Sequence, residues 1–373
     1  MGYDLAMKAL VLGLVLVGAV AGVQPSKIVR QVPAMFVFGD STLDVGNNNY
    51  LPGKDVPRAD KPYYGIDLPG SGKPTGRFSN GYNTADFVAK TLGFEKSPLA
   101  YMVLKARKNL IPSAITRGVS YASAGAGILD ATNAGNNIAL SKQVPLFEST
   151  KAEMEAKLGA KAVSELLAKS FFLLGVGSND FFAFSTAQAK LNRSATQSEA
   201  AAFTRSLLSN YSATITELYK LGARKFAIIN VGPVGCVPLV RVLSPTGACA
   251  AGLNQLAAGF DAALKSTLPT LAAKLPGLAY SLADSMGLTQ ATFANPMALG
   301  FASSDSACCG GGRLGAEAAC APGAAVCGNR DRYVFWDGVH PSQKAAMLGA
   351  QAYYNGPPQY TTPINFKQLA QKS

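Results

Sequence analysis

The sequence predicts an α/β fold in which a mostly parallel sheet is covered by helices on both faces. Four short apolar runs, each ending in a turn, read as buried strands: residues 34–38, 171–176, 225–231 and 278–283. Between them lie long stretches with helical spacing, notably 143–170, 195–221 and 249–275. Apolar strands that alternate with helices are typical of a parallel sheet that is buried on both faces.

The residues that follow these strands predict where a ligand binds. The first strand runs into Gly39-Asp40-Ser41, the second into Gly177-Ser178-Asn179-Asp180, the third into Gly232-Pro233 and the fourth into Asp284. In open parallel sheets such residues gather at one edge, which is where ligands bind. We therefore expect Asp40, Ser41, Asn179 and Asp284 to be neighbours, with residues 45–79 forming a long loop over that edge.

Length and composition favour one globular domain. The chain has 373 residues, of which 48% are hydrophobic and 15% charged, so a large core can form and a disordered chain is excluded. A common domain size of about 150 residues would allow two domains. However, the sequence contains no Ser-Gly linker, internal repeat or abrupt change in composition.

The net charge of +12 indicates a basic surface without naming a partner. Only Lys105, Arg107 and Lys108 form a cluster, and no recognition aromatics are interleaved with it, so nucleic acid is not an expected partner. We expect a solvated basic face, with binding of acidic polysaccharide as the alternative.

The N-terminus predicts export. Residues 1–21 contain Lys8, an apolar run and the ending Ala19-Val20-Ala21, which together are typical of a cleaved signal peptide. The alternative is a membrane anchor, but the apolar run 9–23 is shorter than the roughly 20 residues that a bilayer crossing requires. We therefore expect a secreted protein with no stable membrane anchor.

Six cysteines form an even set, which in an oxidising compartment predicts three disulfides. Adjacent Cys308 and Cys309 are expected to pair elsewhere, with Cys320 and Cys327 as the nearest candidates. The spacing does not fit a zinc site. The sequons at Asn192 and Asn210 agree with the secretory route, and their occupancy is left open.

Ser41 is the candidate nucleophile because it follows a buried strand directly, where its hydroxyl is exposed at the sheet edge. The alternative is a serine that caps the next helix. A hydroxyl nucleophile needs a base that accepts its proton near neutral pH, and His340 is the only histidine in the chain.

Asp337 is the candidate partner of His340. It lies three residues upstream, across a glycine turn that can return its carboxylate to the imidazole ring and fix the tautomer. Pro341 favours a helix start, which would hold His340 at a helix N-terminus.

Acyl transfer also needs donors for the developing oxyanion. The side-chain amide of Asn179 is one candidate, and a backbone N–H from the glycine-rich loop 123–127 is another. In isolation these segments would read as a capped turn and a plain loop.

Four blocks in order resemble the plant GDSL esterase/lipase family of SGNH hydrolases: residues 39–49, residues 121–127, Gly177-Ser178-Asn179-Asp180, and Asp337 with His340-Pro341. The resemblance covers about residues 30–365. It implies a single domain with a flavodoxin-like three-layer α/β/α sandwich. It also implies Ser41 as nucleophile, His340 as base, Asp337 as its orienter, and an oxyanion hole from Ser41, Asn179 and a loop glycine. Gly127 is preferred for that glycine, with Gly125 as the alternative.

These observations predict a secreted serine esterase or lipase that acts on lipid, acetylated polysaccharide or phenolic esters through an acyl-enzyme, with no cofactor or metal. Its basic, secreted character also resembles members of the family that act at the cell wall or cuticle. Two alternatives remain at this stage. One is an acyltransferase with the same three residues, and the other is a catalytically idle protein that binds anionic cell-wall polysaccharide.

Overall fold

The computed structural model describes residues 30–70 and 72–372, so the predicted signal peptide lies outside the described residues. The main sheet has the order β1-β2-β3-β4-β9. Its strands are β1 (Met35–Gly39), β2 (Phe171–Gly175), β3 (Lys225–Ile229), β4 (Ala279–Ala283) and β9 (Thr361–Thr362). β1 to β4 are parallel and β9 is antiparallel. The four predicted strands are confirmed to within two residues at each end.

A further extended segment, residues 117–123, lies on the outer side of β1. The N–H groups of Met35 and Val37 donate to Arg117 and Val119, and those of Tyr121 and Ser123 donate back to Val37 and Gly39. This is the bonding pattern of a parallel strand. With this segment counted as the second strand in chain order, the parallel strands have the spatial order 2-1-3-4-5, as in flavodoxin-like folds. The predicted three-layer α/β/α class is confirmed.

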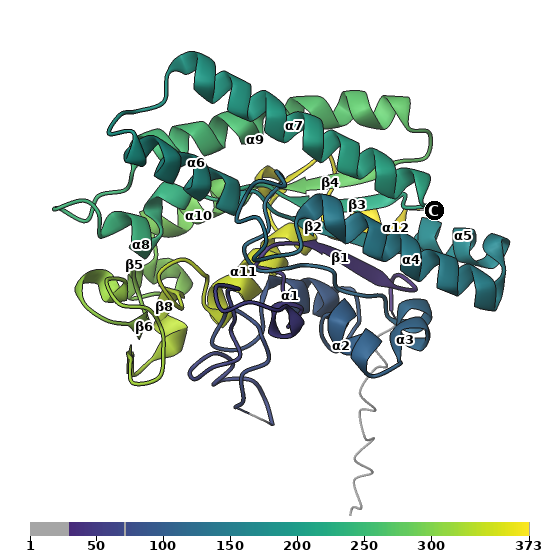
Figure 1. The fold of residues 1–373 in the computed structure, drawn as a ribbon, viewed down its shortest axis with the longest axis horizontal. Helices are drawn as coiled ribbons and strands as arrows, with labels where there is room; N and C mark the ends of the chain where they lie inside the picture. Colours follow the sequence, from purple (N-terminus) through teal and green to yellow (C-terminus); the bar gives the residue numbers. More distant parts are fainter. Residues whose placement is uncertain (1–29, 71, 373) are drawn as a thin grey trace, which may run out of the picture.

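Helices cover both faces of the sheet (Figure 1). They are α1 (Thr84–Thr91), α2 (Tyr101–Ala106), α3 (Leu110–Thr116), α4 (Leu140–Leu158), α5 (Ala160–Lys169), α6 (Ser178–Lys190), α7 (Gln197–Lys220), α8 (Pro238–Arg241), α9 (Ala251–Lys274), α10 (Ser285–Ala294), α11 (Gln343–Asn355) and α12 (Phe366–Gln371). The stretch 143–170 is two helices, because Gly159 adopts a φ of +82° between α4 and α5.

The core lies in two layers, one on each side of the sheet. On one face Phe36, Phe38 and Phe172 pack with side chains of α4, α7 and α9. On the other face Val37 and Leu173 pack with α1, α11 and α12. Both faces of β1 and β2 are therefore buried, which explains why these strands are continuous apolar runs without alternation.

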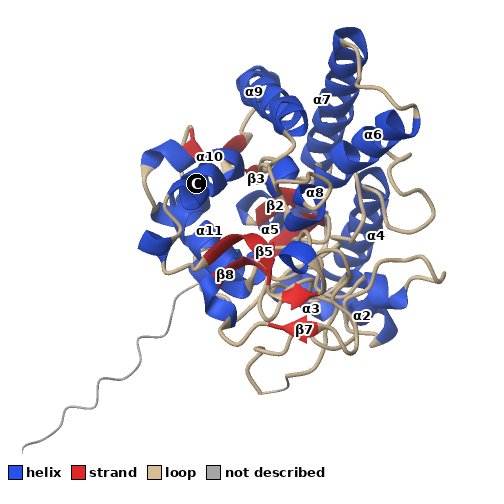
Figure 2. Ribbon diagram, turned by 90° about the vertical axis from the view of Figure 1, so that its left-hand side faces the viewer, coloured by secondary structure: helices blue, strands red, loops and turns tan. Residues whose placement is uncertain are grey.

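Three disulfides are present: Cys236–Cys249, Cys308–Cys327 and Cys309–Cys320. The predicted number, and the partners expected for the adjacent pair, are confirmed. The last two staple a segment that contains small strands β5 (Ser303–Ala307), β6 (Cys309–Gly310), β7 (Ala325–Val326) and β8 (Tyr333–Phe335). Figure 2 shows β5, β7 and β8 among loops on the side facing the viewer. In the part of the chain that the structure describes, no helix has the combined length and apolarity that a bilayer crossing needs.

Candidate active site

Ser41 lies in a tight turn just beyond the end of β1. The turn needs glycine at position 39, because a Cβ there would stand 2.3 Å from the carbonyl oxygen of Gly175 on the neighbouring strand. Asp40 donates its N–H to that same oxygen (3.1 Å), and its Oδ1 accepts from both N–H and hydroxyl of Thr42 (2.9 and 2.8 Å). These bonds fix the turn. No helix begins directly after Ser41, so this serine does not act as a helix cap.

A buried glutamine that sequence reasoning missed also holds this turn. Gln143 of α4 accepts from the Gly39 N–H at 2.9 Å and donates to the Gly39 carbonyl at 2.8 Å. Its amide therefore satisfies both polar groups of the last residue of β1. Glutamine on a helix ordinarily indicates a solvent-facing position, so only the three-dimensional structure reveals this role.

The three side chains predicted to act together lie in contact. His340 Nε2 is 2.8 Å from Ser41 Oγ, and His340 Nδ1 is 2.8 Å from Asp337 Oδ2. The ring of Phe78 packs against the imidazole, with centroids 4.8 Å apart. The chain thus brings together residues that are 299 positions apart in sequence.

The predicted turn between Asp337 and His340 is present, but the predicted helix start is wrong. Asp337 Oδ1 accepts from the N–H groups of Val339 and His340, at 2.9 and 2.8 Å. Helix α11 begins only at Gln343, because Ser342 is its N-cap, and its side chain accepts from the Ala345 N–H. His340 therefore lies in the turn before the helix.

Asp337 is buried and held ionised by its surroundings. Burial alone would raise its pKa, but the attraction of His340 and hydrogen bonds from His340, Val339 and Tyr64 outweigh burial and lower the pKa of Asp337 to about 2. Tyr64 comes from the long loop and donates to Asp337 Oδ2 at 2.7 Å. Burial and the neighbouring carboxylate raise the pKa of Tyr64, so its hydroxyl keeps its proton.

The disulfide-stapled segment pairs directly with the residues that precede Asp337. The N–H of Cys308 donates to Phe335 O (3.1 Å) and that of Cys309 donates to Trp336 O (2.7 Å). Trp336 is fully buried in a cluster with Tyr64 and Phe78. Cys308 and Cys309, each held by its own disulfide, thus fix the backbone that leads into Asp337.

We expect Tyr64→Phe to lower kcat for ester hydrolysis about tenfold with little change in KM, because Asp337 Oδ2 loses one of its two hydrogen-bond partners and keeps only His340 Nδ1. A hydrogen bond to a charged group contributes roughly 1.5–3 kcal/mol. The pKa of Asp337 is lower in the folded chain than in the unfolded chain, so the ionised carboxylate stabilises the fold at neutral pH. This stabilisation is lost as the pH falls from about 4 through about 2. In Tyr64→Phe the free energy of unfolding should therefore depend less on pH over this range, as measured by urea unfolding at several pH values. The matched control is Tyr63→Phe, which removes only an exposed contact with Gly323. An equal effect in both variants would contradict this role.

Asn179 lies in the first turn of α6, immediately beyond β2, as predicted. Its amide donates to the carbonyl oxygen of Ala126 at 3.0 Å, which links the predicted donor to the glycine-rich loop. Since a carboxamide has two N–H groups, one remains for a ligand.

The peptide between Ala126 and Gly127 presents its carbonyl to Asn179. Because this peptide is trans, the N–H of Gly127 points the opposite way. This orientation counts against Gly127 as a donor beside Asn179. Gly125, the other glycine of the loop, therefore remains the alternative donor, with its φ of +83° that favours glycine.

Buried side chains fix the glycine loop. Asp180 accepts from the N–H groups of Ile128 and Leu129 and from the Thr132 hydroxyl.

Two asparagines of the long loop hold the glycine loop from the other direction. Asn47 donates to the carbonyls of Ser120 and Ala122, and Asn48 donates to that of Ala124. The motif residues around Asp44 are thus a brace between the long loop and the glycine loop, a role that sequence reasoning did not assign.

Two more carboxyl groups beneath the site have raised pKa values. Burial raises the pKa of Asp40 to about 6, against the effect of its bonds from Thr42. Burial also raises the pKa of Asp44 to about 6, although Gly46, Asn47 and Ala124 donate to it. The turn that presents Ser41 therefore takes up protons as pH falls through about 6.

Asp284, predicted as a neighbour of Ser41, has a different role. It is the N-cap of α10, accepting from the Gly287 N–H, and also binds Asn230. Within residues 30–70 and 72–372, no group of three or more His, Cys, Asp or Glu side chains is placed to hold a metal ion.

Comparison with known proteins decides the family. The model of the GDSL-like lipase/acylhydrolase family matches residues 35–352. The chain belongs to this family. Similar relatives include the GDSL esterase/lipase At1g71250 of Arabidopsis thaliana, 37% identical over 93% of this chain and 91% of the relative. The Arabidopsis thaliana GDSL esterase/lipase At1g71691 is 36% identical over 91% of this chain and 86% of its own length.

Membership in the GDSL-like lipase/acylhydrolase family makes the chain a carboxylic ester hydrolase of the SGNH type, and the predicted family is confirmed. The family model spans both ends of the site, from β1, which precedes Ser41, to α11, which follows His340.

Proposed function

We propose that the protein is a secreted serine esterase or lipase in which Ser41 is the nucleophile, His340 the general base and Asp337 its orienter. The observation that carries this proposal is the 2.8 Å contact between His340 Nε2 and Ser41 Oγ, with Asp337 on the other ring nitrogen. Residues 30–365 act as one catalytic domain in this proposal.

In the first step Ser41 Oγ attacks the acyl carbon of the ester while its proton moves to His340 Nε2. Asp337 keeps the Nδ1–H tautomer and stabilises the imidazolium. The carbonyl double bond opens, and its electron pair becomes the oxyanion. When the carbonyl re-forms, the bond to the alcohol breaks and the alcohol takes the proton from His340.

In the second step a water molecule replaces the alcohol. His340 takes one proton from water as the water oxygen attacks the acyl-enzyme, and that proton returns to Ser41 Oγ as the acid leaves. This cycle needs no metal or cofactor, since Ser41 and His340 carry every bond and proton transfer.

The oxyanion is stabilised by the Ser41 N–H, the Asn179 amide and the N–H of one glycine of the loop, Gly127 or Gly125. The support is the position of Asn179 against the loop and the network that fixes the loop. A donor that is fixed before reaction needs no reorganisation when charge develops.

We expect Asn179→Ala to lower kcat about 10²- to 10³-fold, the effect typical of removing one oxyanion donor, while KM changes little. Steady-state kinetics on a p-nitrophenyl ester measures this. Asn179→Asp keeps the size of the side chain but replaces its donors with a negative charge, and it should be impaired at least as much. An Asp variant as active as the parent would contradict the donor role.

Secretion into the apoplast or cell wall is supported by three disulfides, which persist in oxidising compartments. The predicted glycosylation sites agree, because Asn192 and Asn210 are both exposed.

Labelling with a fluorophosphonate tests the proposed function. The probe should phosphonylate Ser41 once per chain, as located by mass spectrometry of the modified peptide, and should abolish hydrolysis of p-nitrophenyl butyrate. Modification of another serine with loss of activity, or full activity after Ser41 is modified, would overturn the proposal.

A further inference from the structure

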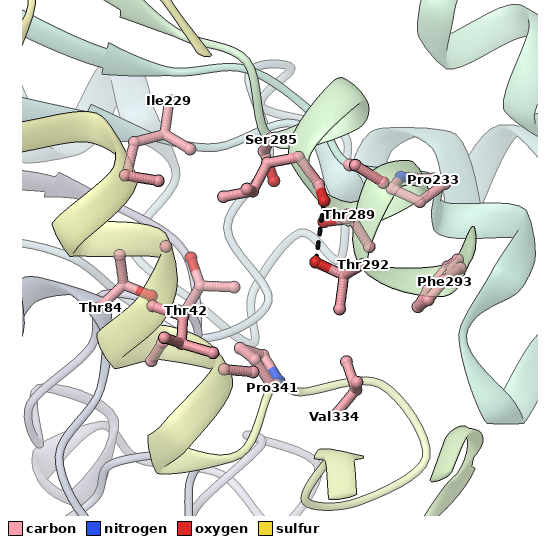
Figure 3. Close-up of a pocket in the computed structure, with 18 of the residues that line it drawn as sticks. Thr42, Thr84, Ile229, Pro233, Ser285, Thr289, Thr292, Phe293, Val334 and Pro341 are labelled. Atoms are coloured by element: carbon pink, nitrogen blue, oxygen red, sulfur yellow. Dashed lines mark hydrogen bonds between the residues drawn. The ribbon is translucent and has the colours of Figure 1, made fainter. Parts of the chain in front are cut away.

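A large cavity lies beside the three residues, on the side of the β2, β3 and β4 strand ends. Its volume is about 570 Å³, within the range of about 300–1,000 Å³ typical of small-molecule sites. It lies between α10, α11 and β8. Figure 3 shows Thr289 and Thr292 of α10 directed into this space, with Pro341 and Val334 along its lower side.

The cavity begins next to the reacting groups. Its lining includes Thr42, which follows Ser41, and Ser178, which precedes Asn179. It also includes Val339 and Pro341, the two residues that flank His340. Ser41, Asn179 and His340 are not themselves in the lining, but each has a chain neighbour there, so the cavity lies next to the point at which an acyl group would be attached.

The lining is apolar in character, with side chains such as Val176, Ile229, Leu288, Phe293, Val334 and Leu348. Several of its polar atoms are already bonded within the protein. Thr42 donates its hydroxyl to Asp40, and Thr292 donates its hydroxyl to Leu288 O of its own helix. Asp40 is the only charged side chain among the described residues that line it. A wall that is mainly apolar suits a hydrocarbon group.

We propose that this cavity binds the acyl chain of the substrate, which makes the substrate a carboxylic ester with a medium or long hydrocarbon acyl group. The proposal rests on the proposed function of Ser41. An acetyl group would leave most of the 570 Å³ unfilled, so acetylated polysaccharide is not the substrate class that the cavity fits.

The acyl part of the substrate suits the cavity better than the alcohol part, because the alcohol leaves first in the reaction. The acyl group stays bonded to Ser41 after the alcohol has left, so it gains from an apolar site throughout the cycle. The alcohol must leave so that water can reach His340, and an apolar site beside the nucleophile would retain a hydrocarbon alcohol.

Two ester series test the assignment. The first varies the acyl group of p-nitrophenyl esters from 2 to 16 carbons, and the second varies the alcohol of acetate esters from 2 to 12 carbons. We expect kcat/KM in the first series to rise by up to about fourfold per carbon until the cavity is filled, the equivalent of about 0.8 kcal/mol per buried methylene. The second series should stay within a few-fold.

Variants that fill the cavity give the sharper test. Thr292→Trp from α10, and Ala345→Phe from α11, should each lower the ratio of kcat/KM for the long acyl esters to kcat/KM for the acetate at least tenfold. The matched control is Gln290→Trp, on the exposed side of α10 and outside the lining, which should keep the profile of the parent. The second variant keeps the test usable where the first fails to fold.

The outcomes separate this inference from the function it rests on. If Ser41 is not labelled by the fluorophosphonate, the proposed function fails. If Ser41 is labelled but acyl length has no effect, or activity follows alcohol length instead, the acyl assignment alone is overturned. A profile that both filling variants leave unchanged would also overturn it.

Discussion

Ser41→Ala is expected to lower kcat for a p-nitrophenyl ester by about 10⁴- to 10⁶-fold, the range seen when a serine nucleophile of this type is removed. Without Oγ there is no covalent intermediate, and His340 Nε2 loses the group from which it takes a proton at 2.8 Å. The small residual rate would come from oxyanion donors and binding alone. Steady-state kinetics measures the loss, with enzyme purified from a host that lacks background esterase.

The fold should tolerate this change, because Ser41 is only half-buried and its backbone turn is held by Asp40, Gly175 and Gln143. The urea midpoint of the variant should match that of the parent. Ser209→Ala, an exposed serine on α7, is the control and should retain full activity. Hydrolysis by Ser41→Ala at more than about one hundredth of the parental rate would exclude Ser41 as the nucleophile.

Asp337→Asn is expected to lower kcat by about 10⁴-fold, the loss that follows when an orienting carboxylate becomes an amide and favours the wrong histidine tautomer. Here the carboxylate faces Nδ1 and also accepts from two N–H groups and from the Tyr64 hydroxyl. An amide cannot accept all of these bonds at once. The loss should appear in kcat more than in KM.

Raising the pH should restore part of the activity of Asp337→Asn, because hydroxide becomes more abundant and can take the Ser41 proton in place of the wrongly oriented imidazole. A pH profile of kcat from 5 to 10 therefore checks the assignment. Asp331→Asn, an exposed carboxylate six residues upstream, is the matched control and should behave like the parent. Comparable losses in both variants would indicate damage to the loop and not to histidine orientation.

Much of the fold was predictable because the sheet is parallel and buried on both faces. Such strands are continuous apolar runs, so β1 to β4 stand out in the sequence with little ambiguity. Segment 117–123 was missed because its residues include Gly118 and Ser120, and its bonding to β1 depends on contacts that no local pattern reveals.

Residues of the candidate site could be predicted where the chain contains few residues of the type that the chemistry requires. A single histidine in the chain leaves one imidazole for Ser41, and the spacing to Asp337 gives a turn that the structure contains. Tyr64 and Gln143 could not be found this way. Tyr64 lies 273 residues from Asp337 in sequence, and its role arises only when the long loop folds over the sheet edge.

The helix start at Pro341 was wrong because proline is permitted at a helix start without requiring one. Ser342 sets the start of the helix instead, because its side chain caps α11 and its N–H donates to the carbonyl of Val334. The orientation of the Ala126–Gly127 peptide is likewise set by a distant partner, Asn179, and not by the glycine pattern of the loop.

The pairing of Cys308 and Cys309 with the backbone before Asp337 also bears on when the enzyme matures. A newly made copy whose thiols are still reduced lacks the covalent clamp on the strand that delivers the carboxylate and imidazole. Full hydrolytic activity should therefore require that both of these disulfides have formed.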